Sequence, residues 1–556
     1  MIDHPQSSVA SAPPYQTLSE AELQAPRSAP KSPARPWWKS PSSAWPWLIA
    51  LVLFALPVTT YWDTTFHRFG LRDDYSNLRE AREEPGKIVE FTASHARPLY
   101  GLLLQHSFER IDSIQELEWL RLAGTVGLGL VAIALFGLLR QLGWEPAGAA
   151  FTAAMISLVP SAQVIASWAT AWPYSVATIL SLGGFALAGL VGERWKKLGR
   201  MGAVLLVAAS ALTYQPNSLF YLIGIAASLP LRRGRALGLN LSWAGMHLAI
   251  VFSGLALAFL AMKGLYAMGV FDPSDRVAFE HDPFGKLWWF LREPFPNALN
   301  LFVLNDDEGA TWRAYLAGAG MAGLLLAAGT SVEWRERGRH SGGFWLILLA
   351  ALPVAAYSAN FVAAERFATY RTIFALTGVL LIFFALSWNN LCGLAGRRRG
   401  RWVELPGYAA MLTLAIPIAQ THAHTLIAVP QNEELQVLEH AANRVALRDR
   451  PLRIYFMQAK PADNPAEISY NDEFGSLSTS GADWISNEMF KHILREHFPG
   501  ASDRQRRYEM RVGLEPPPKG EKFDLVIDMR QLRGFGSLYA GPPNPNKNST
   551  HSDPPP

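Results

Sequence analysis

The feature that most constrains this chain is a series of long apolar runs separated by short polar loops. A run of about 20 mostly apolar residues can cross the hydrocarbon core of a bilayer as a helix. About eleven such runs are predicted. They lie near residues 45–62, 119–140, 147–166, 172–192, 200–214, 216–231, 241–262, 313–330, 344–361, 369–389 and 405–429. The pattern predicts an all-α polytopic membrane protein. The two runs beside Tyr214–Asn217 are short and are expected to be kinked, tilted or partly re-entrant.

Composition and charge support this class and argue against others. Charged residues are 17% of the chain, against roughly a quarter in soluble domains. The net charge of +4 is small for 556 residues, and no basic stripe interleaved with aromatics is present, so nucleic-acid binding is not expected. The single cysteine, Cys392, leaves no intrachain disulfide, which is more typical of a bacterial envelope protein than of a disulfide-rich secreted one.

The basic loops predict an orientation. If the N-terminus is cytoplasmic, the basic clusters all fall in loops on the cytoplasmic side, where anionic headgroups and the membrane potential hold them. These clusters are Lys196–Lys197, Arg232–Arg233, Arg335–Arg339 and Arg397–Arg399. The predicted location is therefore the bacterial inner membrane, with the C-terminal region extracytoplasmic.

The polar segments complete the predicted domain organisation. Strands at Leu452–Met457 and Phe523–Ile527, with an amphipathic helix at Trp484–His497 between them, predict a small α/β domain. The predicted division is a disordered cytoplasmic tail over 1–44, a transmembrane domain over 45–430 with outer loops at about 63–118 and 263–312, a soluble extracytoplasmic domain over 431–540, and a disordered tail over 541–556.

Charged side chains are nearly absent from the predicted spans and collect at the outer rim. Transporters and pumps usually need charged groups near the midplane of the membrane, so this distribution favours chemistry at the membrane surface over transport. Asp73 and Asp74 directly follow the first apolar run, and Arg97 follows them in the same outer loop. An acidic pair with a nearby arginine predicts a lipid-linked, phosphate-bearing substrate.

Sugar transfer from a polyprenyl-phosphate donor would assign a role to each candidate. Asp73 or Asp74 would be the base that takes the proton from the acceptor hydroxyl, while the other orients it. Cationic groups or a divalent metal, Mg²⁺ or Mn²⁺, must stabilise the leaving phosphate. The candidates for phosphate binding are Arg97, Arg366 and Arg371, because guanidinium groups match phosphate oxygens. The candidates for lining the sugar site are Trp168, Trp172, Tyr174, Tyr214 and Gln215, and those for a metal are Asp306 and Asp307.

Each candidate also has a structural interpretation. The aspartate pair is equally typical of a helix cap or a solvated loop, and Arg97 before Pro98 is equally typical of an interface anchor. The acidic run at Asn305–Glu308 is more often a solvated loop than a metal site, and Asp472-Glu473 is a weaker candidate still. The functional interpretation requires the aspartate pair and the three arginines to converge in one outward groove.

The layout and short motifs resemble the GT-C superfamily of membrane glycosyltransferases, and within it the bacterial polyprenyl-phosphate-sugar-dependent transferases that glucosylate O-antigen. The resemblance rests on four elements, namely Asp73-Asp74-Tyr75, Arg97-Pro98-Leu99-Tyr100-Gly101, Tyr214-Gln215-Pro216 and Glu365-Arg366 with Arg371. It implies catalytic first-loop aspartates, an undecaprenyl-phosphate sugar donor, inversion at the sugar, and a glycan, lipid or protein acceptor. It covers about residues 45–430.

Three other functions compete with hexosyl transfer. A polysaccharide polymerase or ligase would rely on late-loop arginines such as Arg366 and Arg371. A lipid or glycan flippase would need polar midplane residues and repeat symmetry, which the sequence lacks. A scaffold or sensor would depend on the region after Pro430.

Overall fold

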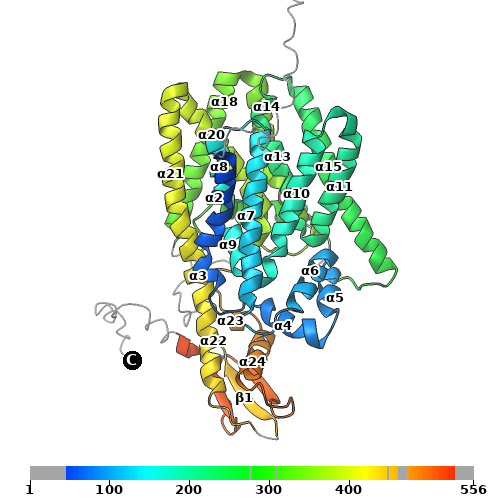
Figure 1. The fold of residues 1–556 in the computed structure, drawn as a ribbon, viewed down its shortest axis with the longest axis vertical. Coiled ribbons are helices and arrows are strands. Elements are labelled where there is room, and N and C mark those ends of the chain that lie inside the picture. Colours follow the sequence, from blue (N-terminus) through cyan, green and yellow to red (C-terminus); the bar gives the residue numbers. More distant parts are fainter. Residues whose placement is uncertain (1–44, 275–277, 307–310, 448–449, 461–472, 533–556) are drawn as a thin grey trace, which may run out of the picture. The chain divides into compact units, whose positions relative to one another are not determined.

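Apolar helices dominate the computed structural model (Figure 1), which describes residues 45–274, 278–306, 311–447, 450–460 and 473–532. Within these residues, six helical segments are long and apolar enough to cross a membrane. They are α7 (Leu117–Gln141), Ala169–Leu190 including α10 (Pro173–Leu190), α15 (Leu237–Ala267), α18 (Trp312–Ala355), Tyr370–Leu394 including α20 (Phe374–Leu394), and Arg399–Ala442. The chain is therefore a multi-pass membrane protein.

The long helix α18 covers two of the predicted spans because it folds back on itself. Gly338 has φ 80° and ψ 171°, a non-helical conformation that glycine adopts readily. The Nε1 of Trp345 donates to Thr330 Oγ1 at 2.9 Å, although 15 residues of straight helix would separate these groups by about 22 Å. The predicted spans 313–330 and 344–361 are thus antiparallel halves joined at this turn.

Other predicted spans are broken by proline. The run 147–166 becomes α8 (Pro146–Ile156) and α9 (Pro160–Ser167), bent by 54°, because Pro160 lacks a backbone donor and keeps Val159 extended. The run 216–231 becomes α12 (Gln215–Ser218), α13 (Tyr221–Ala227) and α14 (Leu229–Arg232), after α11 (Lys196–Thr213). With α2 (Trp45–Thr60) only 16 residues long, the count of eleven spans stays a prediction.

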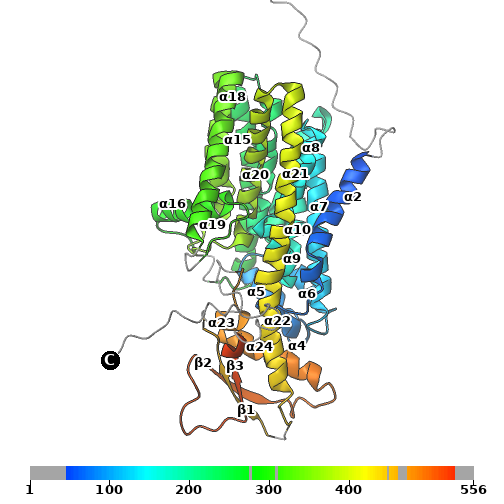
Figure 2. The ribbon, with the colours of Figure 1, turned by 90° about the vertical axis from the view of Figure 1, so that its left-hand side faces the viewer.

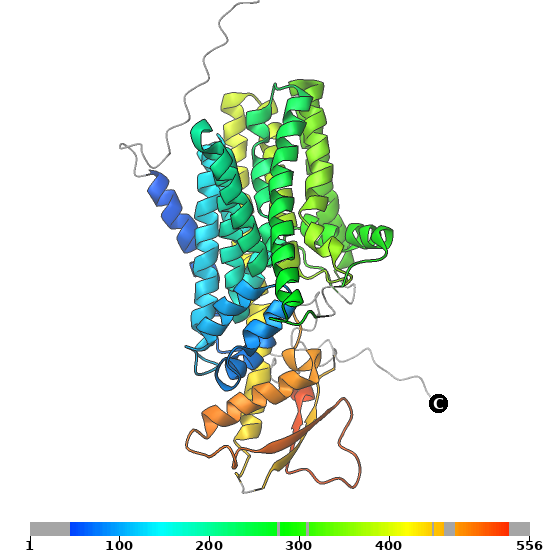
Figure 3. The same ribbon diagram turned by 90° about the vertical axis from the view of Figure 1, so that its right-hand side faces the viewer.

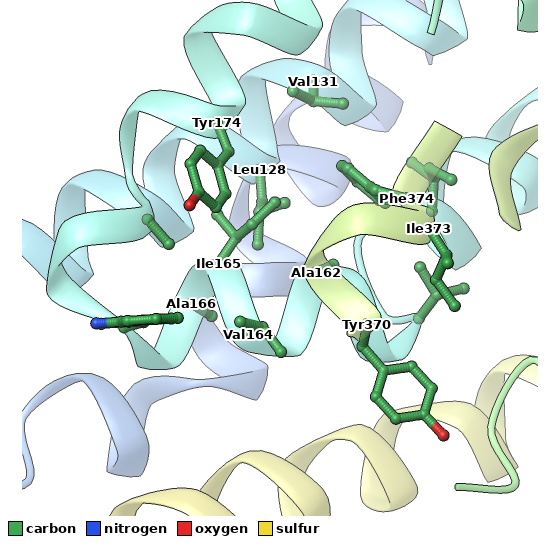
Figure 4. Packing of buried hydrophobic residues seen from close by; sticks show 14 of the residues in the cluster. Leu128, Val131, Ala162, Val164, Ile165, Ala166, Tyr174, Tyr370, Ile373 and Phe374 are labelled. Atoms are coloured by element: carbon green, nitrogen blue, oxygen red, sulfur yellow. The ribbon is translucent and has the colours of Figure 1, made fainter. Parts of the chain in front are cut away.

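The core of the bundle forms where α7, α9 and α20 meet (Figure 4). A Cβ on Gly124 of α7 would lie only 2.6 Å from the carbonyl oxygen of Ile165, so only glycine allows α7 and α9 to approach this closely. The side chains labelled in Figure 4 are Leu128, Val131, Ala162, Val164, Ile165, Ala166, Tyr174, Tyr370, Ile373 and Phe374. This packing fixes the helix ends that surround the candidate site.

The two predicted outer loops are helical. The first contains α3 (Trp62–Thr65), α4 (Asp73–Glu83), α5 (Lys87–Ser94) and α6 (Pro98–Phe108), and the second contains α16 (Pro283–Arg292) and α17 (Pro294–Leu299). A further short helix, α19 (Ser358–Val362), follows α18. In Figure 1, α14 and the turn of α18 lie at the end of the bundle away from α4, which groups the basic clusters of those segments on one side.

The C-terminal region contains a three-stranded parallel sheet in the order β2-β1-β3. The prediction anticipated β1 (Leu452–Met457), α24 (Asp483–His497) and β3 (Leu525–Asp528) but missed β2 (Tyr508–Gly513). Ile454 in the central strand aligns with Met510 on one side and Leu525 on the other. The edge strand β2 is partly exposed and carries Glu509 and Arg511, so it lacks the continuous apolar run of β1 that made that strand recognisable.

The C-terminal region packs directly on the first outer loop, with α24 beside α4 (Figures 2 and 3). The Arg79 side chain donates to Glu488 at 2.8 Å, and the ring Nε2 of His492 lies 2.9 Å from the carbonyl oxygen of Tyr75. A π-helical turn, His422–Ala428, joins α21 (Arg397–Thr421) to α22 (Val429–Ala442). The described residues between 45 and 532 consequently belong to one compact unit.

Candidate active site

A cavity of about 710 Å³ lies between the first outer loop and the ends of several bundle helices. Five of the predicted site residues line it, namely Asp73, Arg97, Tyr214, Gln215 and Arg371. Of the other predicted sugar-site aromatics, Trp168 and Tyr174 line it too, whereas Trp172 is not part of the lining. The lining does not include Asp74 or Arg366. The structure therefore brings together one aspartate and two arginines of the predicted groove.

A strained turn precedes the two aspartates, which point in different directions. Arg72 has φ 46°, which is rare for a residue other than glycine, and its conformation is held by contacts to the C-terminal region. Its backbone N–H donates to Ser478 Oγ at 3.0 Å, and its guanidinium donates to Ser476 Oγ at 3.1 Å. Helix α4 begins at the next residue, and consecutive helical residues point about 100° apart. Asp73 is exposed on the cavity side and Asp74 is fully buried.

Asp74 joins two distant segments. One carboxylate oxygen accepts the N–H of Leu71 at 2.8 Å and the other accepts the N–H of Thr170 at 3.0 Å. Burial raises the pKa of Asp74 to about 7, against the opposing effects of these two hydrogen bonds and of the Arg121 guanidinium. Both oxygens of this carboxylate are occupied by backbone donors, so its geometry is that of a structural connection.

Arg97 is held by Gln215, the first residue of α12. Its Nε donates to Gln215 Oε1 at 2.8 Å, and the amide of Gln215 donates in turn to the carbonyl of Ala96 at 3.0 Å. Ala96 has φ 60°, a second positive value immediately before a predicted site residue. The Arg97 guanidinium also lies 4.9 Å from the ring centre of Tyr214. These contacts fix Arg97 at the cavity wall.

Three tyrosines form the wall beneath Arg97. The rings of Tyr174 and Tyr214 stack with centres 3.8 Å apart, and those of Tyr100 and Tyr174 stack at 5.6 Å. The hydroxyl of Tyr100 donates to the carbonyl of Thr170 at 3.0 Å. This row of rings connects the first loop to α10 and the α11–α12 turn, and all three tyrosines line the cavity.

Arg371 reaches the cavity from the 3₁₀ turn Tyr370–Ile373 that precedes α20. Its guanidinium lies 4.6 Å from the ring centre of Trp168 and 5.2 Å from that of Phe367. The Nε of Arg371 is 3.6 Å from a carboxylate oxygen of Glu473. Arg371 is thus the second arginine of the cavity, whose lining also includes Lys87 and Lys263, and it pairs with a carboxylate from the C-terminal region.

Arg366 lies apart from this group. Its guanidinium is within 4.0 Å of Glu280 and 3.7 Å of Asp282, and its side chain is 45% exposed. The predicted convergence of three arginines is therefore not what the fold produces, because Ala363–Glu365 pair with Lys286 and Ala278 and direct the neighbouring Arg366 toward the second outer loop.

The candidate metal ligands are not gathered by the described residues. An Asp306 carboxylate oxygen accepts the N–H of Thr311 at 3.0 Å, just before α18, while Asp307 lies outside the described residues. Among the residues that the structure describes, no group of three or more His, Cys, Asp or Glu side chains is arranged to hold a metal ion.

The cavity also contains residues that sequence reasoning missed. Asn77 and Glu80 line it beside Asp73, and their spacing on α4 (i, i+4 and i+7) is a signal that could have identified them. Trp484 lines it from α24 of the C-terminal region. Helix α15 contributes Leu255, Ala258, Phe259 and Met262, which form an apolar wall, together with Lys263 and Tyr266.

Two solved structures of ArnT from Cupriavidus metallidurans are similar to this chain. The apo structure is 14% identical with a TM-score of 0.37, and the match covers 80% of this chain and 84% of that one. The structure bound to undecaprenyl phosphate is 14% identical with a TM-score of 0.40, and the match covers 90% and 89%. No protein-family model and no curated protein matches the chain. At these values, a functional assignment depends on the residues of the site itself.

Proposed function

We propose that this protein is a GT-C-type membrane glycosyltransferase that moves a sugar from a polyprenyl-phosphate donor to an acceptor hydroxyl. One observation carries the proposal. A single cavity is lined by an exposed aspartate (Asp73), two guanidinium groups (Arg97 and Arg371), stacked aromatic rings and an apolar helix wall. These are the four chemistries that such a donor and its transfer require.

The donor would bind with its two ends in different surroundings. Arg97 and Arg371 would hold the phosphate, since guanidinium groups donate paired hydrogen bonds to phosphate oxygens and neutralise the charge that grows on the leaving group. The apolar residues of α15, including Leu255, Phe259 and Met262, would accommodate the first prenyl units. Tyr214 and Trp168 would support the sugar between these regions.

Asp73 would act as the general base. It is exposed and lines the cavity, so it is accessible to an acceptor hydroxyl, whose proton it would take as the oxygen attacks the anomeric carbon. Attack on the face opposite the phosphate inverts the configuration of the sugar. Asp74 would position this base by anchoring the start of α4 to Leu71 and Thr170. The acceptor would be an envelope glycan, lipid or protein at the outer face of the inner membrane.

The test compares the lipid and glycan profiles of cells that produce the natural chain, no chain, or the Asp73→Asn chain. We expect the natural chain to add one sugar-bearing species that Asp73→Asn does not. Asp63→Asn is the matched control, because Asp63 is an exposed first-loop aspartate outside the cavity lining. Full sugar transfer by Asp73→Asn would refute the assignment of the base.

Substitution of Arg366 distinguishes the proposed glycosyltransferase from a polysaccharide polymerase or ligase. That reaction was expected to need Arg366 and Arg371 together, whereas the present proposal needs Arg97 and Arg371. An Arg366→Gln chain that retains sugar transfer, beside an Arg97→Gln chain that loses it, would favour the glycosyltransferase.

A further inference from the structure

A short segment of the C-terminal region, Glu473-Phe474-Gly475, packs into the bundle beside the cavity. Gly475 donates its N–H to the carbonyl of Leu426 at 2.6 Å. The Phe474 ring packs edge-on against Tyr370 with centres 5.3 Å apart, and it is 6.0 Å from the ring of His422. All three residues of the segment are buried. The segment is therefore held firmly against the turn that presents Arg371.

This packing places a buried carboxylate behind a cavity arginine. The Glu473 side chain is 0% exposed, and that of Arg371 is 16% exposed. The contact between them is made through Nε at 3.6 Å, while the guanidinium plane rests on Trp168 and Arg371 lines the cavity. Arg371 therefore lies between an anionic neighbour from the C-terminal region and the cavity.

We infer that Glu473 is a positioning residue that sets how tightly Arg371 holds the donor and product phosphate. The inference rests on the proposed function and deepens it by giving the C-terminal region a part in turnover. Glu473 orients the guanidinium and partly neutralises it. A polyprenyl phosphate bound to Arg371 then competes with the Glu473 carboxylate for the same cation. The phosphate is bound less tightly as a result, and the product dissociates after transfer.

The sign of the effect distinguishes this role from simple structural support. Removing a supporting contact weakens binding, whereas removing a competing anion strengthens it. Glu473→Gln keeps the length of the side chain and one accepting oxygen, and it removes the negative charge. Glu473→Asp keeps the charge but moves it away from Arg371 by one methylene.

The experiment measures the Kd of the detergent-solubilised full chain for undecaprenyl phosphate, following intrinsic tryptophan fluorescence. We expect Glu473→Gln to bind roughly three- to tenfold more tightly than the natural chain, with a slower dissociation rate. The Kd of Glu473→Asp should lie between those of Glu473→Gln and the natural chain. This variant keeps the test decisive if Glu473→Gln does not fold. Glu433→Gln is the matched control, since Glu433 is a buried glutamate that does not line the cavity, and its Kd should not change.

The outcomes separate this inference from the proposed function. An unchanged or weaker affinity in both Glu473 variants, with weaker binding in Arg371→Gln, would overturn the inference alone. Equal tightening in Glu433→Gln would also overturn it, because the effect would then be a general one of charge. Unchanged binding in both Arg97→Gln and Arg371→Gln would overturn the proposed phosphate site itself.

Discussion

Replacing Asp74 with asparagine should impair stability, whereas replacing Asp73 with asparagine should impair sugar transfer. Asp74→Asn keeps the size of the side chain but replaces one of two accepting oxygens with an NH₂ group. That group would face the N–H of either Leu71 or Thr170, which now donate to the carboxylate at 2.8 and 3.0 Å. A fully buried donor left without its acceptor costs about 1–3 kcal/mol. We therefore expect Asp74→Asn to lower the stability of the chain by about that amount.

Asp73→Asn should affect stability less than Asp74→Asn, because the Asp73 side chain is exposed. Its transfer rate should fall by a factor of about 10² to 10⁴, the usual contribution of a general base. The assay is thermal unfolding of both purified variants in one detergent, alongside transfer at a temperature where both are folded. A stable Asp74→Asn chain with no transfer, beside an active Asp73→Asn chain, would show that the roles of the two residues have been exchanged.

Four further perturbations test other parts of the structure. The raised pKa of Asp74 favours its neutral form in the folded chain, so the contribution of Asp74 to stability should fall as pH rises from about 4 to about 7. Asp74→Asn should remove this pH dependence of the unfolding temperature. Arg97→Lys should weaken undecaprenyl phosphate binding in the Kd assay, because lysine cannot keep the Nε contact with Gln215 while donating a paired bond. Glu333 accepts hydrogen bonds from Arg233 and Arg337 at 2.9 Å each, and its side chain is 2% exposed. Glu333→Ala should lower the free energy of unfolding by about 2–3 kcal/mol, measured by thermal unfolding; the loss is limited because the two arginines are partly exposed. Gly329→Ala should also lower the unfolding temperature, because its Cβ would lie 2.5 Å from the Ser387 backbone.

The sequence predicts the class of fold well because apolar runs and strand patterns are local signals. It identifies β1, β3 and α24 within a residue or two at most ends. It also predicts as separate spans, 313–330 and 344–361, the two halves of α18 that the turn at Gly338 joins, because the basic residues around that glycine indicate a loop.

The site was predicted less completely because its geometry depends on contacts between distant residues. Asp73 and Asp74 are neighbours in the chain, and only the start of a helix at residue 73 separates their surroundings. Arg366 and Arg371 are five residues apart, yet one pairs with the second outer loop and the other with Trp168. Glu473 follows Arg371 by 102 positions, a separation that no local pattern reports.

The contact between α4 and α24 has a consequence for how the protein is made. The Tyr75 carbonyl and its partner His492 are 417 positions apart in the chain. At ordinary rates of synthesis, roughly 20–80 s pass between the emergence of the two residues from the ribosome. During that interval the first-loop helices lack the surface that covers them. A chaperone or the insertion machinery that shields this loop would act in that window, and a chain cut short before residue 473 would reach the membrane with an unfinished site.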